Sequence, residues 1–255
     1  MSKFLLNLAY KHVALAAMLS LANVFREKTD LPIEQPLTVA DVKPGSHVSP
    51  PLLIGFGGSL ITSNYFFGFN NGYLANFKKL EPNLNSDSAY QARNRQLAGM
   101  KSKVDMNGAY QLATNWLIKT GIDLAALESK NGHKVTQRSF LKSPGTGTPL
   151  IANSNDVVWL PVFDIEWGRK EVQSQSATYF LPLLVVTIFG PTKELVEMHI
   201  TDDEVIGGAK QPVKDVEKLL AIADTTFLRY DEAQKSKLVA GHATNVPPPN
   251  LVEKP

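Results

Sequence analysis

The sequence contains no cysteine among its 255 residues. Disulfide bonds, thiolate nucleophiles and cysteine-ligated zinc are therefore excluded, and the fold has to be stabilised by a packed core. A large excess of one charge is also missing, because 26 Lys and Arg stand against 24 Asp and Glu. The net charge of +2 is too small to attract a nucleic acid, so we expect no nucleic-acid partner.

The motifs that mark metal and cofactor sites are missing as well. The five histidines show neither His-x-x-x-His nor Glu-x-x-His spacing. The run Gly55-Phe-Gly-Gly-Ser59 lacks the further glycine or the Gly-Lys pair of a phosphate-binding loop, and glycines that relieve crowding in a strand explain it better. The sequence therefore predicts no metal and no cofactor.

The N-terminal segment indicates the compartment. Lys3, Lys11 and His12 precede a weakly polar run, Val13 to Phe25, which has the length of a signal-peptide core and is too short for a stable membrane span. We expect residues 1–25 to be a signal peptide or an N-terminal helix. Export to the periplasm or the extracellular space is favoured, and a cytoplasmic protein with a buried helix is the alternative.

Proline and glycine divide the remaining chain. Six of these residues lie between positions 26 and 51, a composition that disfavours helix and central strand. With 44% hydrophobic residues overall, the chain can form a sizeable core. The predicted organisation is a Pro-rich linker at 26–51, a single domain at 52–241 and a disordered tail at 242–255.

The strongest turn signal lies between two aromatic runs. Tyr65 to Phe69 and Tyr73 to Phe77 flank an Asn71-Gly72 step, which is typical of a two-residue β-turn. The sequence therefore predicts an aromatic β-hairpin near the start of the domain.

A helix and four strands are expected to follow. Asp105 can cap a helix of about Asn107 to Thr120, whose apolar residues recur at helical spacing until Gly121 ends it, and whose Trp116 face should cover a sheet. The predicted fold class is α+β, a helix packed on an antiparallel β-sheet, with C-terminal helices at about 213–223 and 227–239. The expected strands are 135–141, 157–167, 177–189 and 194–200.

The strand from Val157 to Trp167 has two different faces. Trp159, Phe163 and Trp167 alternate on the face expected to be buried, whereas the other face begins apolar and ends with Asp164 and Glu166. Pro161, within the strand, indicates an edge or a bulge.

Two pairs of ionisable residues are the best candidates for chemistry. Asp164 and Glu166 lie two residues apart and share a face, and Glu197 and His199 do the same on the last strand. If the two strands are neighbours, these groups form a carboxylate and imidazole cluster suited to acid–base or metal-assisted hydrolysis. Ordinary solvent-facing residues of a half-buried sheet give the same pattern.

The region from Asn107 to Ile200 also carries a resemblance. Gly108 to Leu117 reads Gly-Ala-Tyr-Gln-Leu-Ala-Thr-Asn-Trp-Leu, antiparallel strands follow, and Gly190-Pro-Thr-Lys193 joins the last two. This order of elements resembles PepSY-type and cystatin-like α+β modules of exported proteins, over less than half of the chain. The resemblance implies an envelope-associated, non-catalytic module that binds or inhibits another protein.

These observations favour a binding protein over an enzyme. The expected partner is another protein, and the contact surface is either a sheet face or the aromatic hairpin, for which the candidate residues are Tyr65, Phe67, Tyr73 and Trp167. A hydrolase that uses Asp164, Glu166, Glu197 and His199 is one alternative. A purely structural envelope protein is the other.

Overall fold

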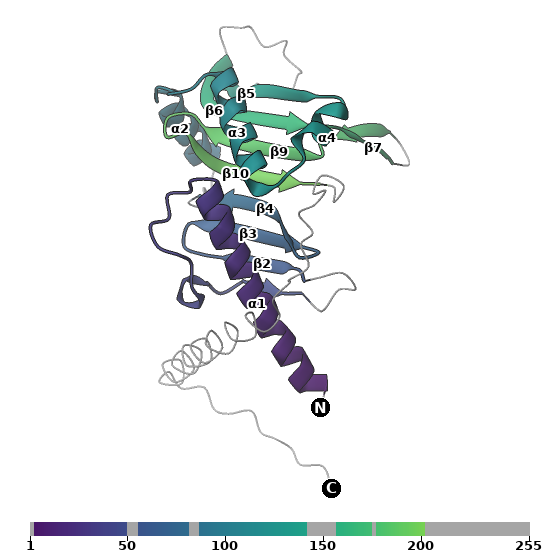
Figure 1. Cartoon of the computed structure of the whole chain (residues 1–255). Coiled ribbons are helices and arrows are strands. Elements are labelled where there is room, and N and C mark those ends of the chain that lie inside the picture. The colour runs from purple at the N-terminus through teal and green to yellow at the C-terminus, as the bar shows by residue number, and fades with distance from the viewer. Residues whose placement is uncertain (1–2, 50–55, 82–86, 142–156, 175–176, 202–255) are drawn as a thin grey trace.

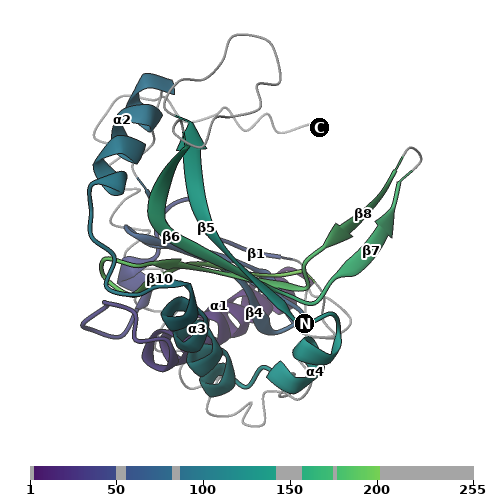
Figure 2. The same cartoon turned by 90° about the horizontal axis from the view of Figure 1, so that it is seen from above.

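A computed structural model describes residues 3–49, 56–81, 87–141, 157–174 and 177–201. Its centre is an eight-stranded antiparallel sheet in the order β1-β2-β3-β4-β10-β9-β6-β5. Two long helices, α1 (Lys3–Lys28) and α3 (Met106–Thr120), lie across the same face of this sheet, as Figure 1 and the view from above in Figure 2 show. The α+β class and the helix on an antiparallel sheet are therefore confirmed. The predicted C-terminal helices and tail lie outside the described residues.

The remaining elements have the following bounds along the chain. The first strands are β1 (His47–Val48), β2 (Gly58–Ile61), β3 (Tyr65–Asn70) and β4 (Tyr73–Lys79). The later strands are β5 (His133–Leu141), β6 (Val157–Trp167), β7 (Lys170–Gln173), β8 (Thr178–Leu181), β9 (Leu184–Phe189) and β10 (Glu194–Ile200). The short helices are η1 (Val39–Asp41), α2 (Asp87–Ala98) and α4 (Leu124–Ser129).

The aromatic hairpin is formed by β3 and β4, as its turn signal predicts. Asn71 and Gly72 both have positive φ, 48° and 83°, which is the backbone of the two-residue turn that matches strand twist. Phe67 and Phe77 are fully buried and face each other across the two strands. Phe25 of α1 packs on Phe77 with ring centroids 5.3 Å apart. This hairpin therefore forms the core beneath the first helix.

The segment predicted to be a linker contributes to the fold instead. Within 26–51, Leu31 and Leu37 belong to the buried core, and His47 and Val48 form β1 at one edge of the sheet. Proline excludes regular helix from such a segment, but it does not prevent isolated apolar residues from packing on a core. The linker prediction was wrong for these residues.

Helix α3 has the ends that the sequence predicts. The Asp105 side chain accepts a hydrogen bond from the Gly108 amide at its start, and Gly121 adopts the left-handed conformation at its end. Its buried face includes Ala113, Trp116 and Leu117, which lie over the strands of the second half of the sheet.

The segment 177–189 forms two strands, where the pattern suggests one. Pro182 has no amide hydrogen to donate, and the chain changes sheets there. Before it, β8 pairs only with β7 among the described strands. After it, β9 inserts between β6 and β10, so these two strands are not neighbours.

Trp159 is not buried, in contrast to the expectation. The pairing of β5 with β6 shifts register between the Gln137–Phe163 and Ser139–Trp159 pairs, which places a bulge around Pro161. Beyond this bulge β5 and β6 curl away from the layer that contains α3 (Figure 2). At this curled end the side chain of Trp159 is 58% exposed.

Helix α1 is part of the core over its second half. Met18 and Ala22 are fully buried, and both belong to the same hydrophobic cluster as the sheet. Among the helices that the structure describes, none is sufficiently long and apolar to cross a membrane.

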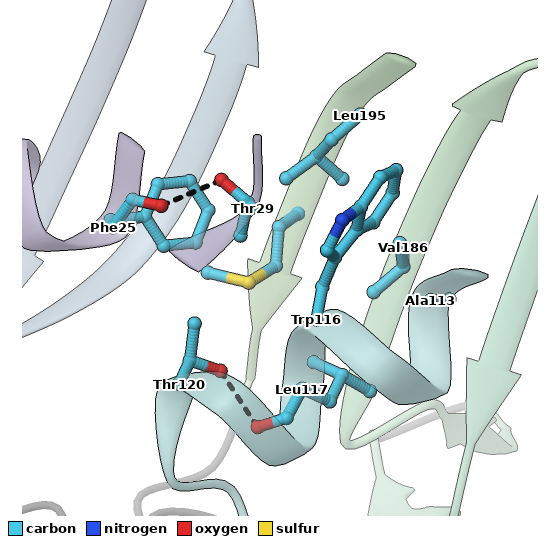
Figure 3. A pocket seen from close by; sticks show the side chains of 9 residues that line it. Phe25, Thr29, Ala113, Trp116, Leu117, Thr120, Val186 and Leu195 are labelled. Carbon is cyan, nitrogen blue, oxygen red and sulfur yellow. Dashed lines mark hydrogen bonds between the residues drawn. The ribbon is translucent and has the colours of Figure 1, made fainter. Parts of the chain in front are cut away.

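A small cavity lies where α1, α3 and the middle of the sheet meet. Its volume is about 10 Å³, and Figure 3 shows Trp116, Leu117 and Val186 among the side chains around it. The hydroxyl group of Thr29 in its wall donates to the Phe25 carbonyl at 2.7 Å and is thus already satisfied. A space of this size holds one water molecule at most, so it is a packing defect and not a ligand site.

Candidate binding surface

The sheet face away from α1 and α3 carries a row of polar side chains. Asp164 of β6, Thr187 of β9 and Glu197 of β10 are directly opposite one another in the register, so they lie on one face. Their neighbours Ile165 and Val186 are buried on the opposite face, under the helices. The polar face that the sequence suggests for Asp164 and Glu197 thus continues across three strands, with a buried Thr187 at its centre.

Arg138 of β5 contacts all three side chains of this row. Its Nε donates to Asp164 Oδ2 at 2.7 Å, and its Nη2 donates to Asp164 Oδ1 at 2.8 Å, which is the paired geometry of a strong charge-assisted contact. Nη2 also donates to Thr187 Oγ1 at 3.2 Å and lies 3.9 Å from Glu197 Oε2. Thr187 in turn donates to Asp164 Oδ1 at 2.7 Å.

The network fixes the charge of Arg138. Its pKa is raised above the ordinary value by the hydrogen bonds to Asp164; burial opposes this shift, and the nearby charges of Asp164 and Glu197 add to it. Arg138 therefore remains a cation, and the Asp164 carboxylate is occupied by three donors. A carboxylate that accepts three hydrogen bonds in this way is an ion-pair partner within the sheet.

The four acid–base candidates share the face without converging. Glu166 of β6 and His199 of β10 are both paired with Val185, which lies on β9 between them. Two strand spacings amount to about 10 Å between backbones. Glu197 reaches Asp164 only through Arg138. The geometry is an open polar surface, whereas a hydrolytic site needs acid and base within reach of one bond.

The four aromatic binding candidates are core residues. Tyr65 and Tyr73 are 6% and 5% exposed, and Phe67 and Trp167 are fully buried. They pack under α1 or at the end of α3, so their rings are not available to a partner in this conformation. A contact surface has to be formed by other residues.

A second polar cluster joins α3, α4 and the start of β5. Glu128 Oε1 accepts hydrogen bonds from Trp167 Nε1 at 2.8 Å and from the Tyr110 hydroxyl at 3.0 Å, and His133 Nδ1 lies 3.0 Å from both carboxylate oxygens. The rings of Tyr110 and His133 are stacked with centroids 4.0 Å apart. We call these four residues the Glu128 cluster.

The hydrogen bonds in the Glu128 cluster change two pKa values. Burial alone raises the pKa of Glu128, but the hydrogen bonds from His133, Trp167 and Tyr110 outweigh it and leave the pKa below the ordinary 4.5. The pKa of Tyr110 is raised, first by burial and then by its hydrogen bond to Glu128. The cluster therefore holds a carboxylate anion surrounded by donors.

Sequence reasoning did not identify the Glu128 cluster. Glu128 and His133 are close in sequence, and the Asn131-Gly132 turn that brings them together is visible as a turn signal. Trp167 and Tyr110 come from other elements, and only the register of β5 with β6, which sets His133 opposite Trp167, places them there.

A two-stranded arm formed by β7 and β8 exposes several successive apolar side chains. The four residues of β8 all face solvent, and Tyr179, Phe180 and Leu181 are 45%, 59% and 43% exposed. The arm projects from the main sheet, on the side away from the helices (Figure 2). Three successive large apolar side chains in water are costly and mark a contact surface.

The Glu128 cluster holds the root of this arm. The arm begins directly after Trp167, whose carbonyl accepts from the Leu183 amide at 3.0 Å where the chain returns from β8. The Gly168 amide donates to the Gly132 carbonyl at 3.0 Å. Main-chain hydrogen bonds thus fix the root of the arm at Trp167, whose buried indole donates to Glu128.

Comparison with known proteins adds no relative. Neither the protein-family models nor the curated proteins nor the solved structures gave a match. In the part of the chain that the structure describes, no group of three or more His, Asp or Glu residues could hold a metal ion.

Proposed function

We propose that this chain is a non-catalytic binding module whose contact surface is the β7–β8 arm. One observation carries the proposal: β8 presents Tyr179, Phe180 and Leu181 to solvent on a strand without a charged residue. An aromatic, uncharged strand at the free edge of a ribbon suits recognition by main-chain pairing, with side chains supplying specificity. The firm root of the arm supports this function, because a fixed strand loses little entropy on binding.

A photo-crosslinking amino acid tests the proposal in the native host. Incorporated at Phe180, it should give a specific cross-linked protein species. The matched control position is Glu171, which is paired with Phe180 within the arm but belongs to β7, the other strand of the arm. The proposal fails if neither position gives a product, or if products at 180 persist after Tyr179→Lys.

We further propose that the protein is exported, as the basic N-terminal residues and the run to Phe25 indicate. Because Met18 and Ala22 pack in the core, we expect the exported chain to retain α1. N-terminal sequencing of protein from the host envelope fraction tests this proposal. Recovery of the intact chain from the cytosol alone would contradict export, and a mature protein that begins near Asn23 would contradict retention of the helix.

A further inference from the structure

The arm has one protected edge and one open edge. The outer strand β7 carries Lys170 and Glu171, and Arg169 precedes it, whereas Thr178 to Leu181 contain no charge. Charged residues along a sheet edge discourage pairing with another strand. Among the described residues, no strand lies beside the outer edge of β8. We therefore expect an additional strand to pair with β8 and not with β7.

The edge of β8 is complementary to itself. We propose that the arm pairs with the arm of a second copy of this chain, with the two β8 strands antiparallel and Phe180 opposite Phe180. In this register Tyr179 of each copy lies opposite Leu181 of the other, so every large side chain meets an apolar one on the same face. The inference rests on the proposed function, because it names the partner of the same surface.

The charges of the arm permit this pairing. Glu171 is directly paired with Phe180 within the arm, so the two Glu171 residues of the dimer stand in one row, separated by both β8 strands. Three strand spacings place them about 14 Å apart. This exceeds the screening length of about 8 Å at physiological ionic strength, and their repulsion is small. Lys170 likewise stays on the outer edges.

Pairing also remedies the weakness of an isolated ribbon. A two-stranded sheet is marginally stable in water, and three or more strands are usually needed. Two arms joined through β8 give four strands with their charged members outside. A lipid surface fits less well, because Gln173 and Ser174, at the end of the arm far from the main sheet, are polar and would have to enter the bilayer first. A partner strand that carries charged residues would place those charges against the side chains of Tyr179 and Phe180, which is unfavourable.

The absence of cysteine from this chain allows a direct test. Opposite residues of an antiparallel pair have backbones about 4.5 to 5.5 Å apart, within the range of a disulfide bond. Phe180→Cys should give a covalent dimer when oxidised glutathione is added to the full-length protein. Glu171→Cys is the matched control on the same arm, and it should stay monomeric under denaturing conditions because its copies are too distant.

A second measurement does not depend on new cysteines. Sedimentation equilibrium of the full chain should show a dimer over a concentration series, Phe180→Lys should weaken association at least tenfold, and Phe180→Tyr should leave it unchanged. Far-UV circular dichroism confirms that each variant is folded. A monomer at all concentrations, or equal cross-linking at positions 171 and 180, overturns the dimer.

Failure of the dimer and failure of the proposed function are distinguishable. If the chain is monomeric but the photo-crosslinker at Phe180 captures a different protein in the host, the arm binds a heterologous partner. In that case the proposed dimer is wrong and the proposed binding function stands. If the chain is monomeric and position 180 captures nothing, both are wrong.

Discussion

Removing the carboxylate of Glu128 tests whether the Glu128 cluster anchors the arm. Glu128→Ala deletes the acceptor of the indole N–H of Trp167, a residue that is fully buried. An unsatisfied buried donor costs about 1–3 kcal/mol. Tyr110 and His133 are partly exposed and can turn to water, so their bonds add little. We expect a loss of about 2 kcal/mol in the free energy of unfolding.

Urea denaturation, followed by far-UV circular dichroism, measures this loss. Trp167→Phe removes the donor, and the double variant should lose less than the sum of the two single variants, by a coupling energy of about 1 kcal/mol. Glu34→Gln, which changes an exposed carboxylate elsewhere, should leave stability within about 0.5 kcal/mol. Additive losses in the double variant would refute the anchor, because the two groups would then act independently.

The lowered pKa of Glu128 gives the same prediction a pH dependence. A carboxyl group whose pKa is lower in the folded chain contributes stability above its ordinary value of 4.5 and loses it as the pH falls through the lower, folded value. The stability difference between the wild type and Glu128→Gln should therefore shrink as the pH decreases below about 4.5. A difference that is constant from pH 7 to pH 3 would contradict the assignment.

Three further predictions concern other parts of the fold, each measured by the same denaturation. Phe25→Ala removes a buried ring that packs on Phe77 and should cost about 3–5 kcal/mol, and a loss below 1 kcal/mol would show that α1 is not part of the core. Gly72→Ala forces a side chain into φ 83° and should cost about 1–2 kcal/mol, whereas Gly99→Ala, at a position without positive φ, should not destabilise. Arg138→Ala should cost about 1 kcal/mol after allowance for its exposure, and no change would mean that its ion pair with Asp164 contributes nothing.

Local signals predicted the parts of this fold that depend on neighbouring residues. The caps of α3 at Asp105 and Gly121, and the turn at Asn71-Gly72, follow from backbone preferences of a few residues. The strand from Val157 to Trp167 was predicted with its observed bounds, because an apolar run that ends in alternation with Asp164 and Glu166 spans its whole length.

Features that depend on distant residues were not predictable from the pattern. Strand β9 lies between β6 and β10 and thereby separates Asp164 from Glu197. The alternation of apolar residues along a strand does not specify which strands become neighbours in the sheet. The exposure of Trp159 accompanies the curl of β6 away from the layer that contains α3, and no local pattern indicates this curl. The pattern predicts one strand over 177–189, which joins β8 to β9, because Tyr179 and Phe180 resemble core residues; the direction that the chain takes at Pro182 is not encoded locally.

The seam between β4 and β10 has a consequence for how the chain is made. Strand β4 ends at Lys79 and its partner ends at Ile200, so roughly 120 residues must be synthesised before the two can pair. At about 5–20 residues per second the ribosome needs roughly 6–24 s for this interval. During that time the aromatic hairpin and α1 have their complete local sequence but an unpaired strand edge. This nascent intermediate is a natural client for a chaperone that shields exposed β-strands.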